Sequence, residues 1–490
     1  MRHEPSRIAI GERVGQLAER HPDAPAIAMV SPEGKTRTLT WSALEAGSNR
    51  AAHALEARGV TADSTLGVAL EPGFEHALTT VGAWKLGACV VPLNASASER
   101  ERHELRDLLG ERAAIVGTGS WATVPTGYAD AARWSDAPQP ARGTPRSASA
   151  SGGSTGAPRI VVRQRAWEYA HGDVLSSGDR ATGLRCGQVQ LVVLPMHHAG
   201  FTGLHHGLAL GHTIVWMERF VPQLVPRVIE QWRVNHIRIV PSLMRLLLDV
   251  PELRSCDRTS VESIHHGAGP CSERVKRAWL ELFDPAKVFE DYSSVERLGV
   301  VTIRGDEWLR RPGSVGRPTA CEVRIVTDDG RDARSGEVGE IFLRSSTTRQ
   351  PEYIGGGPAL RELDGFLTVG DLGRLDDDGY LYLVGRASDV INVGGVNVHP
   401  AEVEAVLTER AEIDDAAVVG RANEYLGEAL HALLVPAAGT QAIDVGAVDR
   451  HCRRRLSLEK VPLSYELVAE LGRTAAGKLR RSLLSDPAAD

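Results

Sequence analysis

The sequence contains few cysteines, no excess of positive charge and no long apolar run. Its six cysteines form no Cys-x-x-Cys pair, so we expect neither a disulfide framework nor a structural zinc site. The formal net charge of −7 excludes the basic surface with which proteins neutralise nucleic-acid phosphates or anionic lipids. No run approaches the ~18 apolar residues of a membrane span, and the N-terminus lacks the apolar core of a signal peptide. We therefore expect a soluble, cytoplasmic protein with neither nucleic-acid nor membrane partners.

The chain is nevertheless long and ordinary in composition. With 490 residues it has room for about three folding units, or for one large domain and a smaller one. Apolar residues make up 42% of it and charged residues 24%, which permits a large buried core. These values exclude a lone binding module and a disordered chain.

The first 120 residues alternate between helical and strand patterns. Residues 42–58 have helical periodicity, with Ser42 as the expected N-cap. Short apolar strands are expected at residues 65–69 and 88–92, separated by a helix at 74–86. This order of elements predicts an α/β fold in which helices cover a mostly parallel sheet.

The pattern changes in the second half of the chain. From about residue 320 to about residue 388, short alternating strands and turns predict a β-rich subdomain. The last hundred residues combine a helix at 400–410 with strands at 416–420 and 429–435. They therefore predict a separate, small α+β unit.

Residues 149–159 form a segment rich in glycine and hydroxyl side chains. Such a loop lets backbone N–H groups and hydroxyls converge on the phosphates of a nucleotide. The residues suited to this role are Ser151, Gly152, Gly153, Ser154, Thr155, Gly156 and Arg159. The loop is not a Walker A loop, because the Lys-Ser/Thr ending is missing. Taken alone, the segment is equally compatible with a flexible linker.

A second, longer pattern begins with the Thr-Val-Gly-Asp run that ends at Asp371. It continues through residues 385–404, which include Arg386, Asp389, Gly394 and Gly395. Without further context, this pattern predicts a β-hairpin turn that leads into an amphipathic helix with a proline in its first turn.

Taken in order, these segments resemble the adenylate-forming superfamily, which includes acyl-CoA synthetases, adenylation domains of peptide synthetases and luciferases. The resemblance covers essentially the whole chain. The segments that carry it are residues 39–44, 84–94, 151–159, 195–198, 267–270, 292–296, 368–371, 385–404 and 473–481. Within the superfamily, residues 266–271 and 312–318 are most similar to long-chain, aryl and bile-acid CoA ligases.

The resemblance implies a large N-terminal domain of stacked α/β sheets with a distorted β-barrel, followed by a small, mobile α+β C-terminal domain. The domains would span residues 1–388 and 389–490, with the hinge at Asp389. In one orientation Lys478 would face the active site. In the other, Gly394 and Gly395 would shape a channel for the pantetheine thiol of CoA.

The resemblance also implies roles for the residues around the phosphates. A carboxylate that attacks the α-phosphorus of ATP meets other anions, so the site needs cations and hydrogen-bond donors. Glu296 would hold Mg²⁺, Lys478 would bridge the acyl carboxylate and the α-phosphate, and His198 would be a further catalytic residue. Asp371 would accept hydrogen bonds from both ribose hydroxyls, and Arg386 would support the ribose or the phosphates.

The adenine would lie between an aromatic side chain and a small-residue wall. Tyr292 would stack on the base, and Asp291 beside it is assigned to the same nucleotide-binding set. The wall would consist of Gly267, Ala268 and Gly269.

Two groups of residues depart from the family pattern. Arg159 replaces the usual lysine of the phosphate loop, and its planar guanidinium is not equivalent to an ammonium. Val295 and Ser293 replace a threonine and a glycine, which removes a hydroxyl expected near the phosphates or Mg²⁺. Ser294, the neighbouring residue, could supply that hydroxyl.

Three histidine pairs form another departure, at residues 197–198, 205–206 and 265–266. Each histidine taken singly is better explained by packing or by surface water. Together they indicate an acyl pocket more polar than a fatty-acyl tunnel, suited to an aryl, hydroxylated or amino-bearing acid. Their spacing isolates no set of metal ligands.

Three functions follow from these observations. The first is a two-step ligase that uses Mg²⁺ and ATP to convert a carboxylic acid to an acyl adenylate, releases pyrophosphate, and passes the acyl group to CoA. The second is an adenylate-forming enzyme of secondary metabolism with another acceptor, such as a carrier-protein thiol or an amine, or an ATP- and nitrite-dependent aryl amine diazotase. The third is a nucleotide-binding protein without catalysis.

Overall fold

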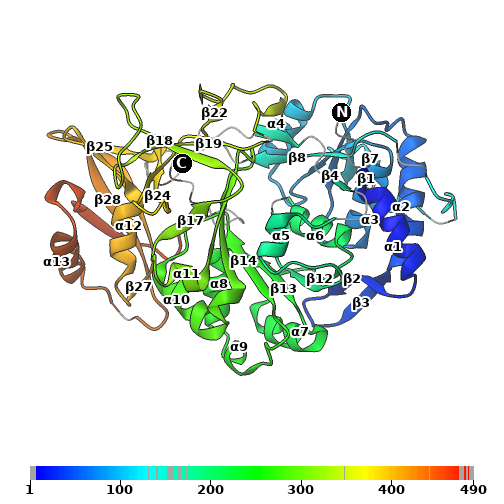
Figure 1. Ribbon diagram of the computed structural model, residues 1–490, viewed down its shortest axis with the longest axis horizontal. Helices are drawn as coiled ribbons and strands as arrows, with labels where there is room; N and C mark the ends of the chain where they lie inside the picture. The colour runs from blue at the N-terminus through cyan, green and yellow to red at the C-terminus, as the bar shows by residue number, and fades with distance from the viewer. Residues whose placement is uncertain are drawn as a thin grey trace.

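The chain folds into three large sheets with helices packed between and around them (Figure 1). The computed structural model describes residues 7–130, 132–139, 142–151, 159–163, 167–170, 174–197, 199–346, 348–440, 442–473, 479, 481 and 484. Two further short strands, β1 (Arg7–Ala9) and β10 (Glu168–Ala170), pair with each other. No described helix combines the length and the apolar character that a membrane span requires.

The first sheet comes mainly from the N-terminal third of the chain. Its central strands run parallel, as the alternation of helices and strands predicts, and an antiparallel hairpin is added at one edge. In spatial order the strands are β20 (Glu352–Ile354), β9 (Arg159–Arg163), β8 (Arg146–Ser151), β5 (Cys89–Pro92), β4 (Thr65–Ala69), β6 (Ala114–Gly117) and β7 (Val124–Pro125).

The second sheet joins a parallel part to the β-rich part of the chain. The parallel part contains β15 (Val288–Ser293), β14 (Ser263–Gly267), β13 (His236–Ile239), β11 (Val189–Val192), β12 (Thr213–Met217) and β2 (Pro25–Val30), with β3 (Thr36–Thr40) antiparallel at its edge. From β15 onward the pairing is antiparallel, through β16 (Val300–Arg304), β17 (Ser314–Pro318), β24 (Leu381–Arg386), β23 (Asp371–Leu375), β19 (Gly339–Arg344), β18 (Glu322–Val326), β22 (Phe366–Leu367) and β21 (Glu362–Leu363). The predicted β-rich subdomain is thus hydrogen-bonded to the end of the parallel sheet.

One layer of helices lies between the first two sheets and another covers the outer face of the second sheet. The inner layer contains α1 (Ile10–Arg20), α2 (Trp41–Glu56), α3 (Phe74–Lys85) and α6 (Ala199–Ala209), which share one apolar core with both sheets. The outer layer contains α7 (Val225–Trp232), α8 (Pro241–Leu248), α9 (Glu252–Ser255) and α10 (Glu273–Leu282). The remaining helices of this domain are α4 (Glu99–Leu109), α5 (Ser177–Ala181) and α11 (Gly305–Trp308).

The N-cap predicted for α2 is wrong by two residues. Thr40 is the N-cap, and its hydroxyl oxygen accepts a hydrogen bond from the Ala43 backbone N–H at 3.2 Å. The Ser42 hydroxyl instead donates to the Pro22 carbonyl at 2.8 Å. Both residue types favour N-caps, so the choice depends on this contact with a distant loop.

The two faces of the parallel strands in the second sheet differ in polarity. Alternate residues of a strand point to opposite faces. The outer face carries Leu191, Ile237, Ile239 and Ile264, which pack against α8 and α10. The inner face carries Gln190, His236, Arg238, Ser263, His265 and Asp291. Because Gln190 donates to the Gly203 carbonyl in α6 at 3.0 Å, this polar face lies toward that helix.

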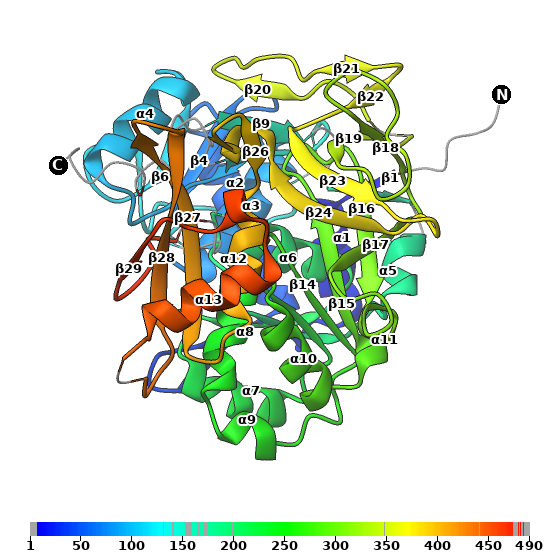
Figure 2. The ribbon, with the colours of Figure 1, turned by 90° about the vertical axis from the view of Figure 1, so that its left-hand side faces the viewer.

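A small α+β domain follows and lies beside the outer helices of the second sheet (Figure 2). Its sheet contains β26 (Val396–Val398), β25 (Ile391–Val393), β28 (Gly427–Pro436), β27 (Ile413–Asn423) and β29 (Ser464–Leu467). Two helices, α12 (Pro400–Thr408) and α13 (Val445–Arg455), bury their apolar sides against one face of this sheet. The predicted separate α+β unit is therefore present, with a core of its own.

Candidate active site

Two of the predicted motifs begin at the carboxyl ends of neighbouring parallel strands in the second sheet. β14 ends at Gly267 and β15 ends at Ser293, so two of the motif segments begin at these strand ends. Ligands of α/β sheets bind in the crevice outside such ends. The fold thereby brings together motif residues from separate parts of the chain.

Three predicted nucleotide-binding residues form one hydrogen-bonded group. Tyr292 donates its hydroxyl to Asp371 Oδ2 at 2.9 Å, and Arg386 Nε donates to Asp371 Oδ1 at 3.0 Å. The antiparallel pairing of β23 with β24 places Asp371 opposite Arg386. Burial, together with the negative charge of Asp371, raises the pKa of Tyr292, so its phenol stays a donor. Two donors thus hold the carboxylate of Asp371, which is 8% exposed, in a fixed position.

A close backbone contact explains the glycine at the end of β14. A Cβ on Gly267 would lie 2.4 Å from the Asp291 carbonyl oxygen, so any side chain there would push β15 away. The next residue, Ala268, has a φ of +67°, which turns the chain sharply out of the sheet before Gly269. Tyr292 is the residue after Asp291, so the predicted wall and the predicted aromatic ring come from adjacent strands.

Asp291 is held on the polar face of the second sheet. His265 Nδ1 lies 2.8 Å from Asp291 Oδ2, and Thr302 donates its hydroxyl to Oδ1 at 2.8 Å. Arg238 adds an ion pair at 3.7 Å. Burial favours the neutral acid, but His265, Arg238 and Thr302 hold the pKa of Asp291 below its usual value. These contacts fix β15 beside Tyr292.

Sequence reasoning missed Tyr353, which lies close to two predicted site residues. Tyr353 is the central residue of β20 and pairs with Val161 of β9. Burial and the negative charge of Glu296 raise the pKa of Tyr353, while the positive charge of Arg159 lowers it. Its hydroxyl is buried and has no hydrogen-bond partner among the described residues. The hydroxyl is therefore a candidate hydrogen-bond donor on the strand beside Arg159, which no sequence motif indicated.

Ser294 is consistent with the role suggested for it. Its hydroxyl oxygen is buried and has no hydrogen-bond partner within the described part of the chain. Val295, which replaces the expected threonine, follows directly. A hydroxyl is therefore present next to the position where the family pattern has one.

Several predicted residues lie outside the described part of the chain. They are Gly152, Gly153, Ser154, Thr155, Gly156, His198 and Lys478. The ends of the glycine-rich segment are described, because β8 and β9 pair with Ser151 opposite Arg159. The segment therefore connects two adjacent antiparallel strands of the first sheet.

The small domain presents the predicted glycine pair in a tight turn. Gly394 and Gly395 connect β25 to β26 with φ values of +59° and +89°, which favour glycine. The Gly394 N–H donates to the Leu426 carbonyl at 2.9 Å, and the Gly395 N–H donates to Asn392 Oδ1 at 2.9 Å. Both glycines are exposed on this turn.

Few residues connect the two domains along the chain. β24 ends at Arg386, a short helical turn covers Ala387–Asp389, and β25 begins two residues later. Across the interface, Asp414 of β27 forms ion pairs with Arg245 of α8 at 2.5 Å and with Arg274 of α10 at 3.1 Å. This contact joins the small domain to the outer helices of the large domain.

The histidine pairs do not form one group. His205 is buried among aromatic rings of the core between the first two sheets. His266 lies on the outer face of the second sheet, with its Nε2 2.5 Å from the buried Lys276 Nζ. His206 and His265 instead belong to the polar side of that sheet, where they contact carboxylates. Among these four, only His206 and His265 can make a pocket on that side polar.

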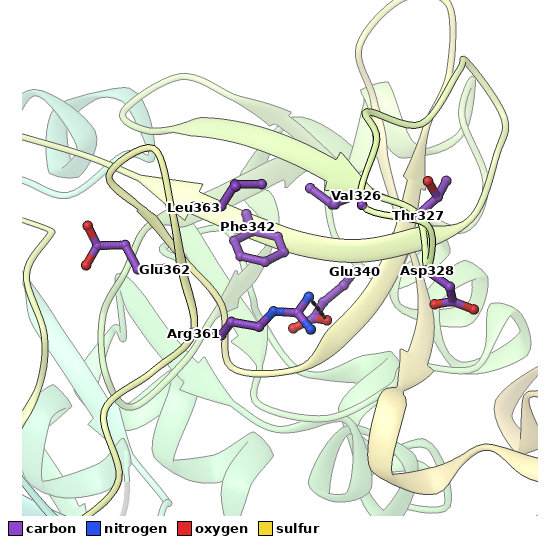
Figure 3. A pocket seen from close by; sticks show the side chains of 9 residues that line it. Val326, Thr327, Asp328, Glu340, Phe342, Arg361, Glu362 and Leu363 are labelled. Carbon is purple, nitrogen blue, oxygen red and sulfur yellow. Dashed lines mark hydrogen bonds and ion pairs between the residues drawn. The ribbon is translucent and has the colours of Figure 1, made fainter.

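A separate recess of about 320 Å³ lies on the β-rich part (Figure 3). Its lining includes Val326, Phe342 and Leu363, and the Arg361 guanidinium lies over the Phe342 ring while pairing with Glu340. None of the predicted site residues lines it. The recess is therefore distinct from the candidate active site.

The comparison with known proteins identifies the family. The AMP-binding enzyme family matches residues 15–350, and the AMP-binding enzyme C-terminal domain matches residues 402–478. The chain belongs to the AMP-binding enzyme family. The enzyme is thus an AMP-forming ligase of the adenylate-forming superfamily, as the ordered motifs indicated.

The enzyme is similar along its whole length to several ligases. It is 29% identical to an indoleacetate–CoA ligase of Aromatoleum aromaticum, with 91% of this chain and 92% of the relative covered. It is 28% identical to a fatty acid–[acyl-carrier-protein] ligase of Streptomyces coeruleorubidus, with 99% and 97% covered. Its fold matches an o-succinylbenzoate CoA synthetase from Bacillus subtilis in complex with the acyl-adenylate intermediate, with a TM-score of 0.83, 26% identity, and 98% and 99% covered.

Proposed function

We propose that this enzyme activates a carboxylic acid with Mg²⁺ and ATP and transfers the acyl group to CoA. The first step forms an acyl adenylate and releases pyrophosphate, and the second forms a thioester and releases AMP. The observation that carries the proposal is the Tyr292–Asp371–Arg386 group at the carboxyl end of the second sheet. It supplies an aromatic ring and a fixed carboxylate, the two features that adenine and ribose require.

We assign the nucleotide contacts on this geometry. Asp371 accepts hydrogen bonds from the ribose hydroxyls, because each carboxylate oxygen can accept more than one bond. Tyr292 covers the base, and the segment from Gly267 to Gly269 forms the opposite wall. The hydrogen bond from Arg386 Nε holds the Asp371 carboxylate in position for the ribose.

The residues around the phosphates fit a shared Mg²⁺ site. Among the described residues, no group of three His, Cys, Asp or Glu side chains could hold a metal ion. Mg²⁺ is usually bound by one or two carboxylates that share the ion with substrate phosphates and water. We assign that carboxylate to Glu296. Arg159 and the hydroxyls of Tyr353 and Ser294 would then face the phosphates.

The remaining roles rest on the family motifs. We assign binding of the β- and γ-phosphates to the segment 151–156, contact with the reacting carboxylate to Lys478, and a position beside the reacting groups to His198. We place the domain boundary between residues 388 and 389 and the hinge at Asp389. Rotation there would exchange Lys478 for the turn at Gly394 and Gly395.

A carrier-protein thiol is the alternative acceptor. The carrier-protein ligase of Streptomyces coeruleorubidus covers nearly the whole enzyme at 28% identity. CoA and the carrier-protein arm both present a pantetheine thiol, so the chemistry of the second step is the same. Comparing CoA with a phosphopantetheinylated carrier protein as acceptor distinguishes the two.

We also propose a cytoplasmic location. All six cysteines are free, and Cys186 is exposed, which suits a reducing compartment. Fractionation of the native producer, with the enzyme detected by antibody, tests this location. Recovery in a membrane or secreted fraction would contradict it.

The proposed reaction is tested with purified enzyme, Mg²⁺ and ATP. We expect pyrophosphate release that depends on an added acid, followed by a thioester that depends on CoA. Pyrophosphate release without a thioester in the presence of CoA would refute CoA as the acceptor. No release with any acid would refute acid activation.

A further inference from the structure

Three arginines from separate segments lie on the polar side of the second sheet. Arg163 and Arg238 contact neighbouring residues of α6, since Arg163 donates to the Thr202 hydroxyl and a Cβ on Gly203 would lie 3.6 Å from Arg238 Cδ, and the charge of Arg297 acts on both arginines. Arg163 is the last residue of β9, Arg238 lies in β13, and Arg297 follows β15. We call them the arginine cluster. Burial, and then the positive charges of Arg297 and Arg238, lower the pKa of Arg163 to about 9. Like charges so close together are unfavourable unless an anion is present.

The arginine cluster keeps unused hydrogen-bond donors. Arg163 donates to the Thr202 hydroxyl at 3.1 Å, but its Nε is buried and has no partner among the described residues. The Arg297 side chain forms no hydrogen bond or ion pair with any described residue, and its φ is +54°, an unfavourable conformation for a side chain of this size. Buried donors are normally satisfied, and strained residues concentrate at binding sites. The buried, unpartnered Nε of Arg163 is therefore a donor available to a ligand.

The nearby carboxylates do not neutralise the cluster. Asp291 contacts Arg238 but also accepts hydrogen bonds from His265 and Thr302. Asp179 accepts hydrogen bonds from the Ser176 backbone N–H and hydroxyl and lies 3.7 Å from His206. Three guanidinium groups therefore face two carboxylates that already have other donors. Within the described part of the chain, at least one positive charge of the cluster is left without a counter-ion.

Two arginines of the cluster are accessible to solvent. The Arg238 side chain is 35% exposed, and Arg297 is exposed as well. An anion that arrives from solvent can therefore reach them. A fatty-acyl chain placed here would remove water from three guanidinium groups and offer no hydrogen bond in return.

The cluster also lies at the right place relative to the adenylation site. Arg297 directly follows Glu296, the proposed Mg²⁺ ligand. Arg163 and Arg159 lie on the same strand, four residues or about 13 Å apart. Two of the three arginines are thus close along the chain to residues assigned to the phosphate site.

We propose that the acid activated by this enzyme carries a second anionic group, and that Arg163, Arg238 and Arg297 bind this group while the first carboxylate is adenylated. The proposal rests on the acid activation proposed above. Guanidinium groups bind carboxylates and phosphonates through paired hydrogen bonds, so the arginine cluster selects the class of acid. His206 and His265, on the same side, make the surroundings polar.

The test measures acid-dependent pyrophosphate release with matched substrates. The diacids are 1,3- and 1,4-benzenedicarboxylate, 4-carboxyphenylacetate and adipate. Each is compared with an analogue in which a neutral amide replaces the second carboxylate. An analogue with a phosphonate at the second position tests whether negative charge is sufficient when the group is not a carboxylate. We expect kcat/KM at least tenfold higher for a diacid than for its neutral analogue. Equal or higher values for the neutral analogues would overturn the proposal.

Variants show whether the arginines act on the second group. Arg163→Gln, Arg238→Gln and Arg297→Gln should each raise KM for the diacid at least tenfold and leave the neutral analogue unchanged or improved. Arg361→Gln, at the separate recess on the β-rich part, is the control and should change KM for neither substrate. Equal losses with both substrates would assign the arginines a structural role and overturn the proposal.

Failure of this proposal is distinguishable from failure of acid activation. Pyrophosphate release with neutral acids alone overturns the second anionic group but leaves acid activation intact. If no acid is turned over, calorimetric titration with the same diacids and amides in the presence of AMP shows whether the arginine cluster binds an anion. Tighter binding of the diacid, lost in Arg297→Gln, would support the arginine cluster as an anion site, and equal binding would refute it.

Discussion

Asp371→Asn tests the assignment of the ribose contact. The side chain keeps its volume but loses its charge and one of two acceptor oxygens. In the wild type those oxygens accept hydrogen bonds from Tyr292 and Arg386 at 2.9 and 3.0 Å. The variant must turn its amide nitrogen toward one of these donors, so one ribose hydroxyl loses its acceptor and the other faces a neutral oxygen in place of a charged one.

The expected loss follows from the bonds removed. A hydrogen bond to a charged group contributes about 1.5–3 kcal/mol. Losing two such bonds to the ribose at the lower value removes about 3 kcal/mol, which corresponds to roughly 150-fold weaker ATP binding. Tyr292→Phe removes only one donor to Asp371 and keeps the ring, so we expect less than tenfold weakening.

The assay is calorimetric titration of the folded protein with ATP and Mg²⁺ in the absence of acid. Circular dichroism confirms the fold of both variants, because Arg386 loses its ionised partner in Asp371→Asn. An ATP affinity within threefold of the wild type would refute the ribose contact. Weakening by Tyr292→Phe equal to that by Asp371→Asn would show that the charge of Asp371 is not what matters.

Three further predictions concern other parts of the site. Lys478→Ala should greatly slow adenylation while sparing thiolysis of a supplied acyl adenylate, and unchanged pyrophosphate release would remove Lys478 from the first step. Tyr353→Phe should lower kcat/KM for ATP about tenfold, as expected for the loss of one hydrogen bond to a charged group. Tyr425→Phe, at a tyrosine that is 89% exposed, is the control and should leave kcat/KM unchanged. Equal kcat/KM values for the two variants would contradict the proposed contact of Tyr353 with the phosphates. Asp414→Ala removes the ion pairs with Arg245 and Arg274 between the two domains. We therefore expect a larger radius of gyration by solution scattering. An unchanged radius of gyration would show that other contacts hold the domains together.

Much of the fold is predictable from local sequence pattern. The helix expected at residues 74–86 is observed at Phe74–Lys85, and the strand expected at 65–69 is observed at those residues. In both elements, the apolar residues of the sequence pattern are those that pack into the core. The N-cap of α2 was not predictable, because it depends on the contact between Ser42 and a loop that is distant in sequence.

Parts of the site depend on tertiary contacts that no local pattern encodes. Tyr353 lies near Arg159 because β20 pairs with β9, which is far away in sequence. His205 and His206 are neighbours, but residues one apart on a helix point about 100° away from each other, so one enters the core and the other faces the polar side. The arginine cluster likewise joins three segments and could not be recognised from the sequence.

The central claim is acid activation followed by thioester formation. It is tested most directly by measuring pyrophosphate release from Mg²⁺ and ATP across aryl, fatty, bile, dicarboxylic and amino acids and nitrite, each with and without CoA. The account predicts release with an acid and a thioester that appears only with CoA. Release with nitrite alone, release with an acid but no thioester, or no release at all would contradict it.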